Sequence, residues 1–268
     1  MKEVKNINIF ITLWTLIYKE IRRFMRIWIQ TLVPPAVTMS LYFVIFGSLI
    51  GPRIGVMDGL DYVQFMIPGL IMMSVITNSY ANVVSSFYGV KFQKSIEELL
   101  ISPMPNWAIL LGFVIGGVSR GILVGVIVFF VSLIFYPEFE IVNLGLTILV
   151  LFLTAILFSL MGFINAVFAD SFDDISVIPT FVLTPLIYLG GVFYSINILP
   201  DFWRSVSMAN PMLYVVNTFR EGMLGISDVS ISFSLSMIVL FIVCFYPYLL
   251  NEQLLLSVFS LYGNLLNL

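Results

Sequence analysis

Residues 107–135 read WAILLGFVIGGVSRGILVGVIVFFVSLIF, and Arg120 is the only charged residue in this stretch. A helix needs about 20 consecutive apolar residues to cross the hydrocarbon core of a bilayer, so the stretch predicts a transmembrane helix. Comparable apolar runs occur before and after it. The six predicted spans are residues 29–50, 62–86, 107–135, 142–168, 176–195 and 231–250.

The composition of the chain agrees with this prediction. Its 268 residues are 60% hydrophobic and 10% charged, and the mean hydropathy is +1.07. Soluble domains contain about 45–50% apolar and about 25% charged residues, so a soluble enzyme, a disordered protein and a fibrous protein are excluded. We predict an all-α polytopic membrane protein with one membrane domain over residues 1–268. Its parts are an amphipathic segment (1–28), a six-span bundle (29–250) and a tail (251–268).

Residue types that are rare or missing limit the chemistry. The chain has no histidine, and Cys244 is its only cysteine, so imidazole catalysis, an intrachain disulfide and a multi-thiolate metal site are excluded. Without paired intramembrane carboxylates, an intramembrane enzyme is also a poor candidate. A net charge of −3 gives no electrostatic footprint for nucleic acid. No GxxxxGK[ST] string occurs, so an ATP-driven function would need a partner chain for hydrolysis. We expect neither catalytic residues nor a cofactor on this chain.

The N-terminal segment 8–28 is amphipathic at helical spacing. Aromatic residues, Trp14 and Trp28 among them, share one face with aliphatic residues. The other face carries the basic residues Lys19, Arg22, Arg23 and Arg26. A helix of this kind lies in the plane of the membrane interface. The alternative, a first core helix of a soluble domain, disagrees with the surrounding composition.

The distribution of Lys and Arg predicts the orientation. Eight basic residues fall on one side of the six spans, namely Lys2, Lys5, Lys19, Arg22, Arg23, Arg26, Lys91 and Lys94. Three fall on the other side, namely Arg53, Arg204 and Arg220. We therefore expect the N-terminus in the cytoplasm.

The loop between spans two and three reads GVKFQKSIEELLISPMP over residues 89–105. Phe92, Ile96, Leu99 and Leu100 share one helical face, and Pro103 and Pro105 end the predicted helix. Two interpretations stay open. The helix is either a docking surface for a partner or a surface loop whose apolar face rests on lipid headgroups.

Arg120 marks the third span as unusual, because a charge inside a span is costly and indicates a function or a buried partner. Its candidate partners are Asp170, Asp173, Asp174 and backbone carbonyls; the alternative is that it snorkels or faces a wet interior. Gly112, Gly116, Gly117, Gly121 and Gly125 line the same span. Small residues at this spacing let helices approach closely. Packing within the chain and dimerisation are both compatible with them.

The fifth span and the segment after it predict broken helices. Pro179, Pro185 and Gly190–Gly191 make the span easy to bend. Residues 196–225 are too polar for a span and too apolar for a solvated loop, so they predict short interfacial or re-entrant helices, with an ordinary external loop as the alternative. The residues that mark this segment are Pro200, Trp203, Asn210, Pro211 and Arg220, for which Glu221 is a candidate ion-pair partner.

Together these features resemble the ABC-2 type permeases, the membrane half of ATP-binding cassette exporters. The strings that carry the resemblance are RFMRIWIQTLVPP (23–35), PGLIMMSVITNSYANVVSSF (68–87), FQKSIEELLISPMP (92–105) and FDDISVIPTFVLTPLIYLGGVFYS (172–195), followed by LP (199–200) and NP (210–211). The resemblance implies a bacterial inner-membrane homodimer that works with two ATP-binding subunits, which hold the ATP-Mg. It implies export of an amphiphilic, glycan or drug-like substrate.

The resemblance also implies roles for particular residues. The helix with Lys94, Ser95, Ile96, Glu97, Glu98, Leu99 and Leu100 resembles the coupling helix that docks on the ATPase. Residues 10–28 resemble the connecting helix along the membrane surface, and 196–225 the outer re-entrant helices. The tail NEQLLLSVFSLYGNLLNL (251–268) departs from the family by lacking basic residues; an interfacial helix and an altered reading frame are its two interpretations. An ion-gradient-driven secondary transporter is the alternative function.

Overall fold

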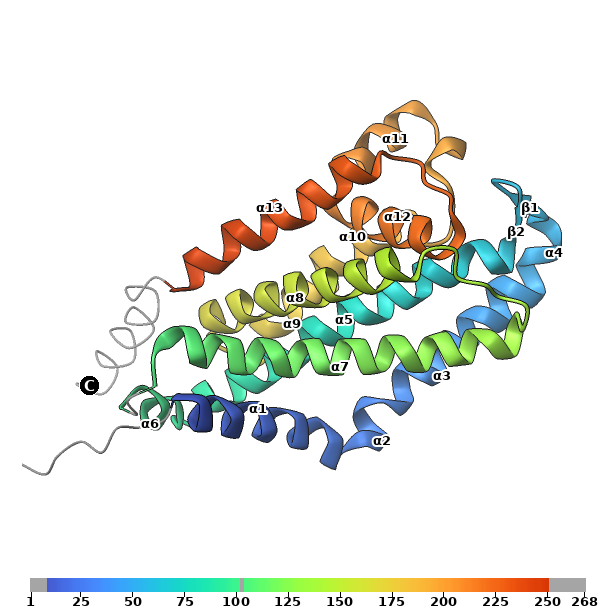
Figure 1. The fold of residues 1–268 in the computed structure, drawn as a ribbon. Helices are drawn as coiled ribbons and strands as arrows, with labels where there is room; N and C mark the ends of the chain where they lie inside the picture. The colour runs from blue at the N-terminus through green and yellow to red at the C-terminus, as the bar shows by residue number, and fades with distance from the viewer. Residues whose placement is uncertain (1–8, 102–103, 251–268) are drawn as a thin grey trace, which may run out of the picture.

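The structure, a computed structural model, describes residues 9–101 and 104–250, and helices make up most of it (Figure 1). The N-terminal part contains α1 (Ile9–Arg26), α2 (Trp28–Thr31), α3 (Val33–Tyr42), the π-helix η1 (Phe43–Ile50), α4 (Gly51–Ile54), β1 (Val56–Met57) and β2 (Leu60–Asp61). The central part contains α5 (Tyr62–Phe92), α6 (Ile96–Ile101), α7 (Asn106–Phe135) and α8 (Leu144–Phe168). The remaining elements are α9 (Asp174–Ile178), the π-helix η2 (Pro179–Leu183), α10 (Thr184–Tyr188), the 3-10 helix η3 (Ile196–Ile198), α11 (Asp201–Met208), α12 (Pro211–Leu224) and α13 (Ile231–Leu250).

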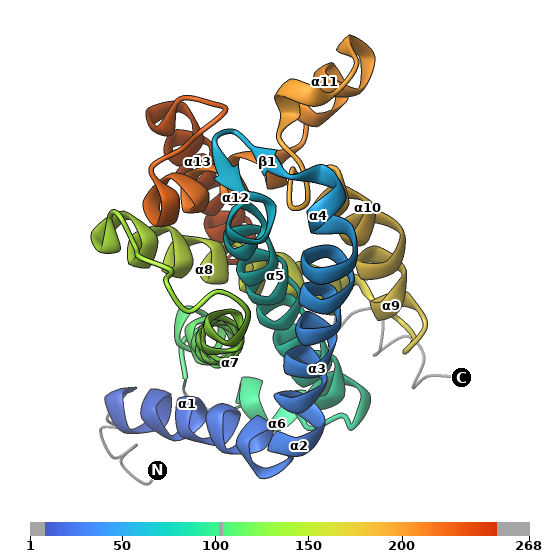
Figure 2. The same ribbon diagram turned by 90° about the vertical axis from the view of Figure 1, so that its right-hand side faces the viewer.

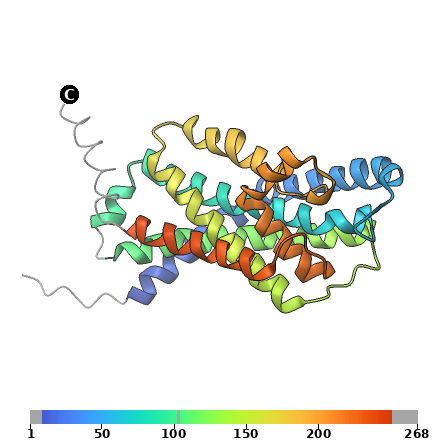
Figure 3. The same ribbon diagram turned by 90° about the horizontal axis from the view of Figure 1, so that it is seen from above.

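The long helices form an elongated bundle with two distinct ends (Figures 1 and 3). One end carries α6, and we call it the α6 end. The other carries the β1–β2 hairpin and α11, and we call it the hairpin end (Figure 2). Helix α1 lies outside the bundle, against α7, and runs obliquely to it (Figures 1 and 2).

Four helical segments are long and apolar enough to cross a membrane: Trp28–Ile54, Tyr62–Phe92, Asn106–Phe135 and Leu144–Phe168. They correspond to the first four predicted spans. Two shorter apolar helical stretches, Asp174–Tyr188 and Ile231–Pro247, correspond to the fifth and sixth. The predicted tail 251–268 lies outside the described residues, as do Lys2, Lys5 and Pro103.

The fifth predicted span ends earlier than the sequence indicated. Its helical part stops at Tyr188 instead of continuing to 195. Gly191 adopts a positive φ of 74°, which turns the chain, and Gly190 packs against Met212 of α12. A residue without a side chain is needed for both features. The helical part of this span is irregular, because the π-helix η2 begins at Pro179; the predicted bending stays a prediction.

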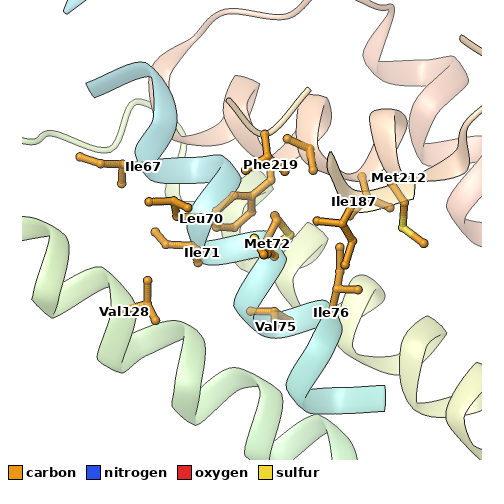
Figure 4. Packing of buried hydrophobic residues seen from close by; sticks show 14 of the residues in the cluster. Ile67, Leu70, Ile71, Met72, Val75, Ile76, Val128, Ile187, Met212 and Phe219 are labelled. Carbon is orange, nitrogen blue, oxygen red and sulfur yellow. The ribbon is translucent and has the colours of Figure 1, made fainter. Parts of the chain in front are cut away.

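Helix α5 is the central element, and it is buried along nearly its whole length. Figure 4 shows its aliphatic residues between Val128 of α7 on one side and Met212 and Phe219 of α12 on another. A helix that is apolar on all faces belongs in the interior of a bundle. The hydrophobic core is therefore centred on α5. It is not centred on an axis that all the long helices share equally.

The glycines of α7 pack against other helices of the same chain. Gly112 and Gly116 face Leu16 and Glu20 of α1. The other three, Gly117, Gly121 and Gly125, face side chains of α5, with Ser159 of α8 also beside Gly117. Of the two interpretations of this glycine stripe, packing within the chain is therefore the one that the structure supports.

The sequence did not predict the β1–β2 hairpin. Val56 pairs with Asp61 and Met57 with Leu60, in antiparallel register. Asp58 and Gly59 form the turn, with positive φ angles of 48° and 84°. An Asp-Gly pair between two short strands is a strong signal for this turn type, but a two-residue strand has no hydrophobic alternation to detect.

Candidate functional site

Helix α1 contacts the bundle through a stripe of buried residues. This stripe coincides with neither the predicted aromatic face nor the predicted basic face of the helix. Leu16, Glu20 and Phe24 are the buried residues of this helix. The aromatic residues Phe10 and Trp14 are exposed, at 82% and 68% of their surface. The helix therefore presents these two aromatic residues away from the protein, as expected for a helix in the membrane interface.

Glu20 is a buried charge that sequence reasoning missed. Its side chain is 1% exposed, and its Oε2 accepts from Ser86 Oγ at 2.5 Å and from Arg23 Nε at 3.3 Å. Arg23 also donates to Asn82, reaching Oδ1 at 2.8 Å and the carbonyl at 3.1 Å. Since a buried carboxylate is costly unless it is paired and hydrogen-bonded, these contacts fasten α1 to α5. A Glu three residues before Arg23, on a helix rich in basic residues, was the available signal.

Arg120 lies next to this network and reaches the bend between α2 and α3. Its Nη2 donates to Asn78 Oδ1 at 3.1 Å and to the Thr31 carbonyl at 3.4 Å. In a continuous helix the Thr31 carbonyl would accept from the amide of residue 35, but Pro35 has no N–H. The guanidinium therefore supplies a donor that the proline removes. We call Glu20, Arg23, Asn78, Asn82, Ser86 and Arg120 the α1–α5–α7 polar cluster.

Two of the three acidic partners considered for Arg120, Asp170 and Asp174, are engaged elsewhere. Asp170 Oδ1 lies 4.0 Å from Lys91 Nζ, and Asp174 Oδ2 accepts from the amides of Asp170 and Ser171. Of the predicted kinds of partner for Arg120, the structure shows a backbone carbonyl, that of Thr31. Its second acceptor, the side-chain oxygen of Asn78, was not predicted.

Lys91, in the last turn of α5, caps α8. Its Nζ donates to the carbonyls of Val167 at 2.9 Å and Ala169 at 2.7 Å. The carbonyls at the C-terminal end of a helix lack partners within the helix, and a cation is favourable there. This contact joins the α6 end of α5 to that of α8.

The other basic residues of α1 contribute less to the contact. Lys19, Arg22 and Arg26 are exposed, and the guanidinium of Arg22 lies 6.0 Å from the ring of Tyr18. Of the four predicted connecting-helix residues, Arg23 alone belongs to the polar cluster.

The predicted coupling segment forms α6, separated from α5 by a sharp turn. Lys94 adopts a positive φ of 58° in this turn, and Ser95 Oγ donates to the Val90 carbonyl at 3.3 Å. Ile96 is buried in a hydrophobic cluster, and Leu99 is half-buried against that cluster. Glu98 is exposed. The side chains of Glu97 and Leu100 lie outside the described residues. Phe92 does not join the α6 face, because it ends α5 and contacts Phe172.

The marked residues of the segment 196–225 begin and fix short helices at the hairpin end. Pro200 is the N-cap of α11, and Asn210 Oδ1 caps α12 by accepting from the Met212 amide at 2.9 Å. Pro211 stands at the first position of α12, where the missing N–H costs nothing. Trp203 is about half-exposed on α11.

Arg220, on α12, is fully buried. It donates to the Gly191 carbonyl, and its guanidinium lies 4.0 Å from the centre of the Phe65 ring. The ion pair with Glu221 that the sequence suggested is not among the contacts of the described residues. Arg220 instead joins α12 to α5 and to the turn after α10.

The charge of Asp174 and the absence of a metal-ligand group among the described residues limit the chemistry of the protein. Hydrogen bonds from the Asp170 amide, the Ser171 hydroxyl and the Ser171 amide lower the pKa of Asp174, so this carboxylate stays charged at the start of α9. Among residues 9–101 and 104–250, no group of three or more Cys, Asp or Glu side chains could hold a metal ion.

Comparisons with known proteins agree on one family. The sequence model of the ABC-2 type transporters matches residues 12–224. The chain is 60% identical over 228 residues to the inner membrane transport permease YadH of Escherichia coli K12, which covers 85% of this chain and 89% of the relative. It is 26% identical over 187 residues to nodulation protein J of Rhizobium meliloti, covering 69% of this chain and 71% of the relative.

Proposed function

The chain belongs to the ABC-2 type transporter family, and from this premise we propose that it is the permease subunit of an ATP-binding cassette exporter. ATP hydrolysis would occur on a separate subunit, which binds the ATP-Mg. The substrate class that we propose is an amphiphilic, glycan or drug-like molecule. The similarity to an inner membrane transport permease supports a location in the bacterial inner membrane.

The α1–α5–α7 polar cluster is the observation that carries this proposal beyond family membership. A permease without its own ATPase must receive motion from a partner, and α1 lies outside the bundle where a partner can reach it. Because Glu20 and Arg23 tie α1 to Ser86 and Asn82 of the central helix, a displacement of α1 would act directly on the core. Separating α1 from α5 would leave the buried Glu20 carboxylate without the Ser86 hydroxyl, and an unpaired buried charge is costly.

The α6 segment supports a docking role at the same end. The Ile96 and Leu99 side chains anchor the helix on the core, and Glu98 remains exposed. We propose that residues 94–100 dock on the ATPase and that α1 forms a second contact with it. The excess of basic residues near this end supports its placement in the cytoplasm, together with the N-terminus.

We further propose a six-span bundle for the single membrane domain. Residues 176–188 would form the fifth span, and α13 the sixth. The short helices η3, α11 and α12 would form a re-entrant outer segment. Two copies of the permease would pair with two ATPase subunits.

Co-purification of the full-length protein from its native membrane tests this proposal. We expect a stoichiometric ATP-binding cassette subunit to accompany the permease after solubilisation in several detergents. A homo-oligomer that never carries an ATPase would contradict the proposal and favour an ion-gradient-driven secondary transporter. Arg120 would then be the first residue to substitute, because it is a half-buried charge within a candidate span.

A further inference from the structure

Helix α1 carries a row of basic residues that takes no part in its contact with the bundle. Lys19, Arg22 and Arg26 are exposed, and at about 100° per residue they lie within about 60° of one another around the helix axis. We call these three residues the basic row. The centre of the buried stripe of α1 lies about 130° away from it, so the row faces away from α5 and α7.

The contact of α1 with α5 places the basic row at the depth of lipid headgroups. Ser86, which donates to Glu20, lies about 36 Å along α5 from its first residue, Tyr62, at a rise of 1.5 Å per residue. Asp61 precedes Tyr62 and is an exposed acid, so that end of α5 lies at a membrane surface. Because the hydrocarbon core is about 30 Å thick, the contact with Glu20 lies just beyond the opposite boundary.

No acid of α1 neutralises the basic row. Glu20 is the only acid between Ile9 and Arg26, and it is buried against α5. Within residues 9–101 and 104–250, the ion pairs involve neither Lys19 nor Arg22 nor Arg26. Three cations therefore face outward along about 10 Å of the helix, where a negatively charged partner is electrostatically favourable.

The face next to the basic row favours a membrane as this partner. Phe10, Trp14 and Tyr18 are exposed there, and the guanidinium of Arg22 lies 6.0 Å from the centre of the Tyr18 ring. The aromatic and the basic face therefore meet along one edge. A helix of this kind buries its aromatic face at the boundary of the acyl chains, and its cations then lie level with the phosphates.

We propose that the basic row binds the phosphate groups of anionic phospholipids. The guanidinium groups of Arg22 and Arg26 match phosphate oxygens in bidentate geometry, and Lys19 adds a point charge. A lipid with a net negative charge is selected over a zwitterionic lipid, because the ammonium group of the zwitterion would be repelled by the same cations. This selection does not depend on the proposed transport function.

Quenching of tryptophan fluorescence by brominated lipids tests the selection. The full-length protein is reconstituted in phosphatidylcholine and phosphatidylglycerol at one fixed ratio, with bromine on the chains of either lipid. Trp107→Phe with Trp203→Phe leaves Trp14 and Trp28, both exposed, as reporters at α1. We expect phosphatidylglycerol to be enriched about threefold around them relative to the bulk. Quenching in proportion to the bulk ratio would overturn the proposal and leave a basic face that is only hydrated.

Arg22→Gln with Arg26→Gln removes two charges of the row with little risk to folding. Both residues are exposed, and glutamine has a helix propensity similar to that of arginine. This variant should lose most of the enrichment. Arg53→Gln with Arg204→Gln, the same change at exposed residues of the hairpin end, is the matched control and should keep it. An equal loss in both variants would contradict a site on α1.

Arg22→Lys with Arg26→Lys separates charge from a structural role of the two side chains. This variant keeps both charges, so most of the enrichment should remain, and 1 M salt should reduce it by screening. Loss of the enrichment in the lysine variant, or an enrichment that 1 M salt leaves unchanged, would contradict binding through charge.

The ATPase is the competing partner for the basic row. Full enrichment in the glutamine variant, together with loss of the co-purifying ATPase, would assign the row to a protein interface and overturn the lipid proposal. Loss of the enrichment with the ATPase retained would support it. Because the quenching measurement uses the permease alone and no ATP, the lipid proposal and the proposed function can fail independently.

Discussion

A single proline explains a contact of the half-buried arginine inside the third span. Pro35 has no amide hydrogen for the Thr31 carbonyl, and Arg120 donates to that carbonyl at 3.4 Å. Arg120→Met would leave the Thr31 carbonyl and Asn78 Oδ1 without this donor. We expect a loss of about 1–3 kcal/mol in the free energy of unfolding, measured in mixed lipid–detergent micelles.

A double variant with Pro35→Ala tests whether the contact with the Thr31 carbonyl accounts for part of this loss of stability. Pro35→Ala restores an amide at position 35, so the Thr31 carbonyl regains a donor from its own helix. Arg120→Met should then cost about 1 kcal/mol less than it does beside Pro35. The same cost in both backgrounds would mean that the contact with Thr31 contributes nothing.

Protonation of Asp174 provides a test at the start of α9. Its carboxylate accepts from the amides of Asp170 and Ser171, and Ser171 Oγ in turn accepts from the Asp174 amide at 3.1 Å, which makes a capping box. Because these bonds lower the pKa of Asp174 in the folded protein, their stabilisation is complete above the unfolded pKa of about 3.9 and is lost as the pH falls through the folded pKa. Tm measured from pH 7 to pH 3 should fall less in Asp174→Asn than in wild type.

Asp173→Asn is the matched control for this pH dependence. Asp173 is the adjacent acid, and its carboxylate accepts no hydrogen bond among the described residues. The control should follow the wild-type curve, and a curve that instead matches Asp174→Asn would show that any charge in this loop has the same effect.

Arg120 and Glu20 show which part of the polar cluster was predictable from the sequence. Arg120 was evident because a charge inside 29 otherwise uncharged residues is conspicuous. Glu20 was not, because it shares a helix that was expected to lie in the interface with four basic residues. Its burial depends on Gly116, which lies in another helix, and no local pattern connects the two positions.

At the scale of whole elements, the glycines of α7 set the distance between helices. A Cβ on Gly116 would lie 2.8 Å from Glu20 Cβ, closer than side chains approach. Gly116→Ala should therefore displace α1 and destabilise the protein by about 1–3 kcal/mol, in spite of the better helix propensity of alanine. Thermal unfolding in nanodiscs measures the change.

Gly89→Ala separates packing from helix propensity. Gly89 lies within α5, and nothing lies within 4 Å of a Cβ placed there. This control should be neutral or slightly stabilising, since it gains helix propensity without a clash. Destabilisation of both variants to the same extent would contradict the packing explanation.

The elements divide into those with a periodic signal and those without one. The ends of α7 and α8 were predicted to within two residues, because about 20 consecutive apolar residues indicate a membrane-spanning helix. The helix α5 continues to Phe92, six residues beyond its predicted end at residue 86. The end of the fifth span was misjudged, since the apolar run continues past the turn at Gly191. The alternation that predicts strands needs more residues than the two of β1.

At the scale of the whole molecule, α5 connects the two ends of the bundle. Its α6 end holds Lys91 and the contacts with α1, and its hairpin end holds Phe65 beneath Arg220. A central helix that is packed on all sides moves as a unit, since protein interiors are close-packed and transmit strain. A displacement of α1 would therefore reach Phe65 and Arg220 at the hairpin end through this helix.

Charge reversal on α6 tests whether that signal begins at the proposed docking surface. Glu98 is exposed, and Glu97 precedes it in the same short helix. The double variant Glu97→Lys with Glu98→Lys should insert normally but lose most of its ATP-dependent export, because reversed charges on a docking surface weaken the contact with its partner. ATPase co-purification and export by proteoliposomes are the two measurements.

Glu138→Lys with Glu140→Lys makes the same charge change at the opposite end of α7, where both residues are exposed. If α6 is the docking surface, this control retains both the ATPase and export, although its net charge equals that of the test variant. Full export by the α6 variant would remove α6 from the coupling path. Loss of export with the ATPase still bound would instead mean that α6 transmits motion without providing the affinity, which would leave α1 as the principal contact.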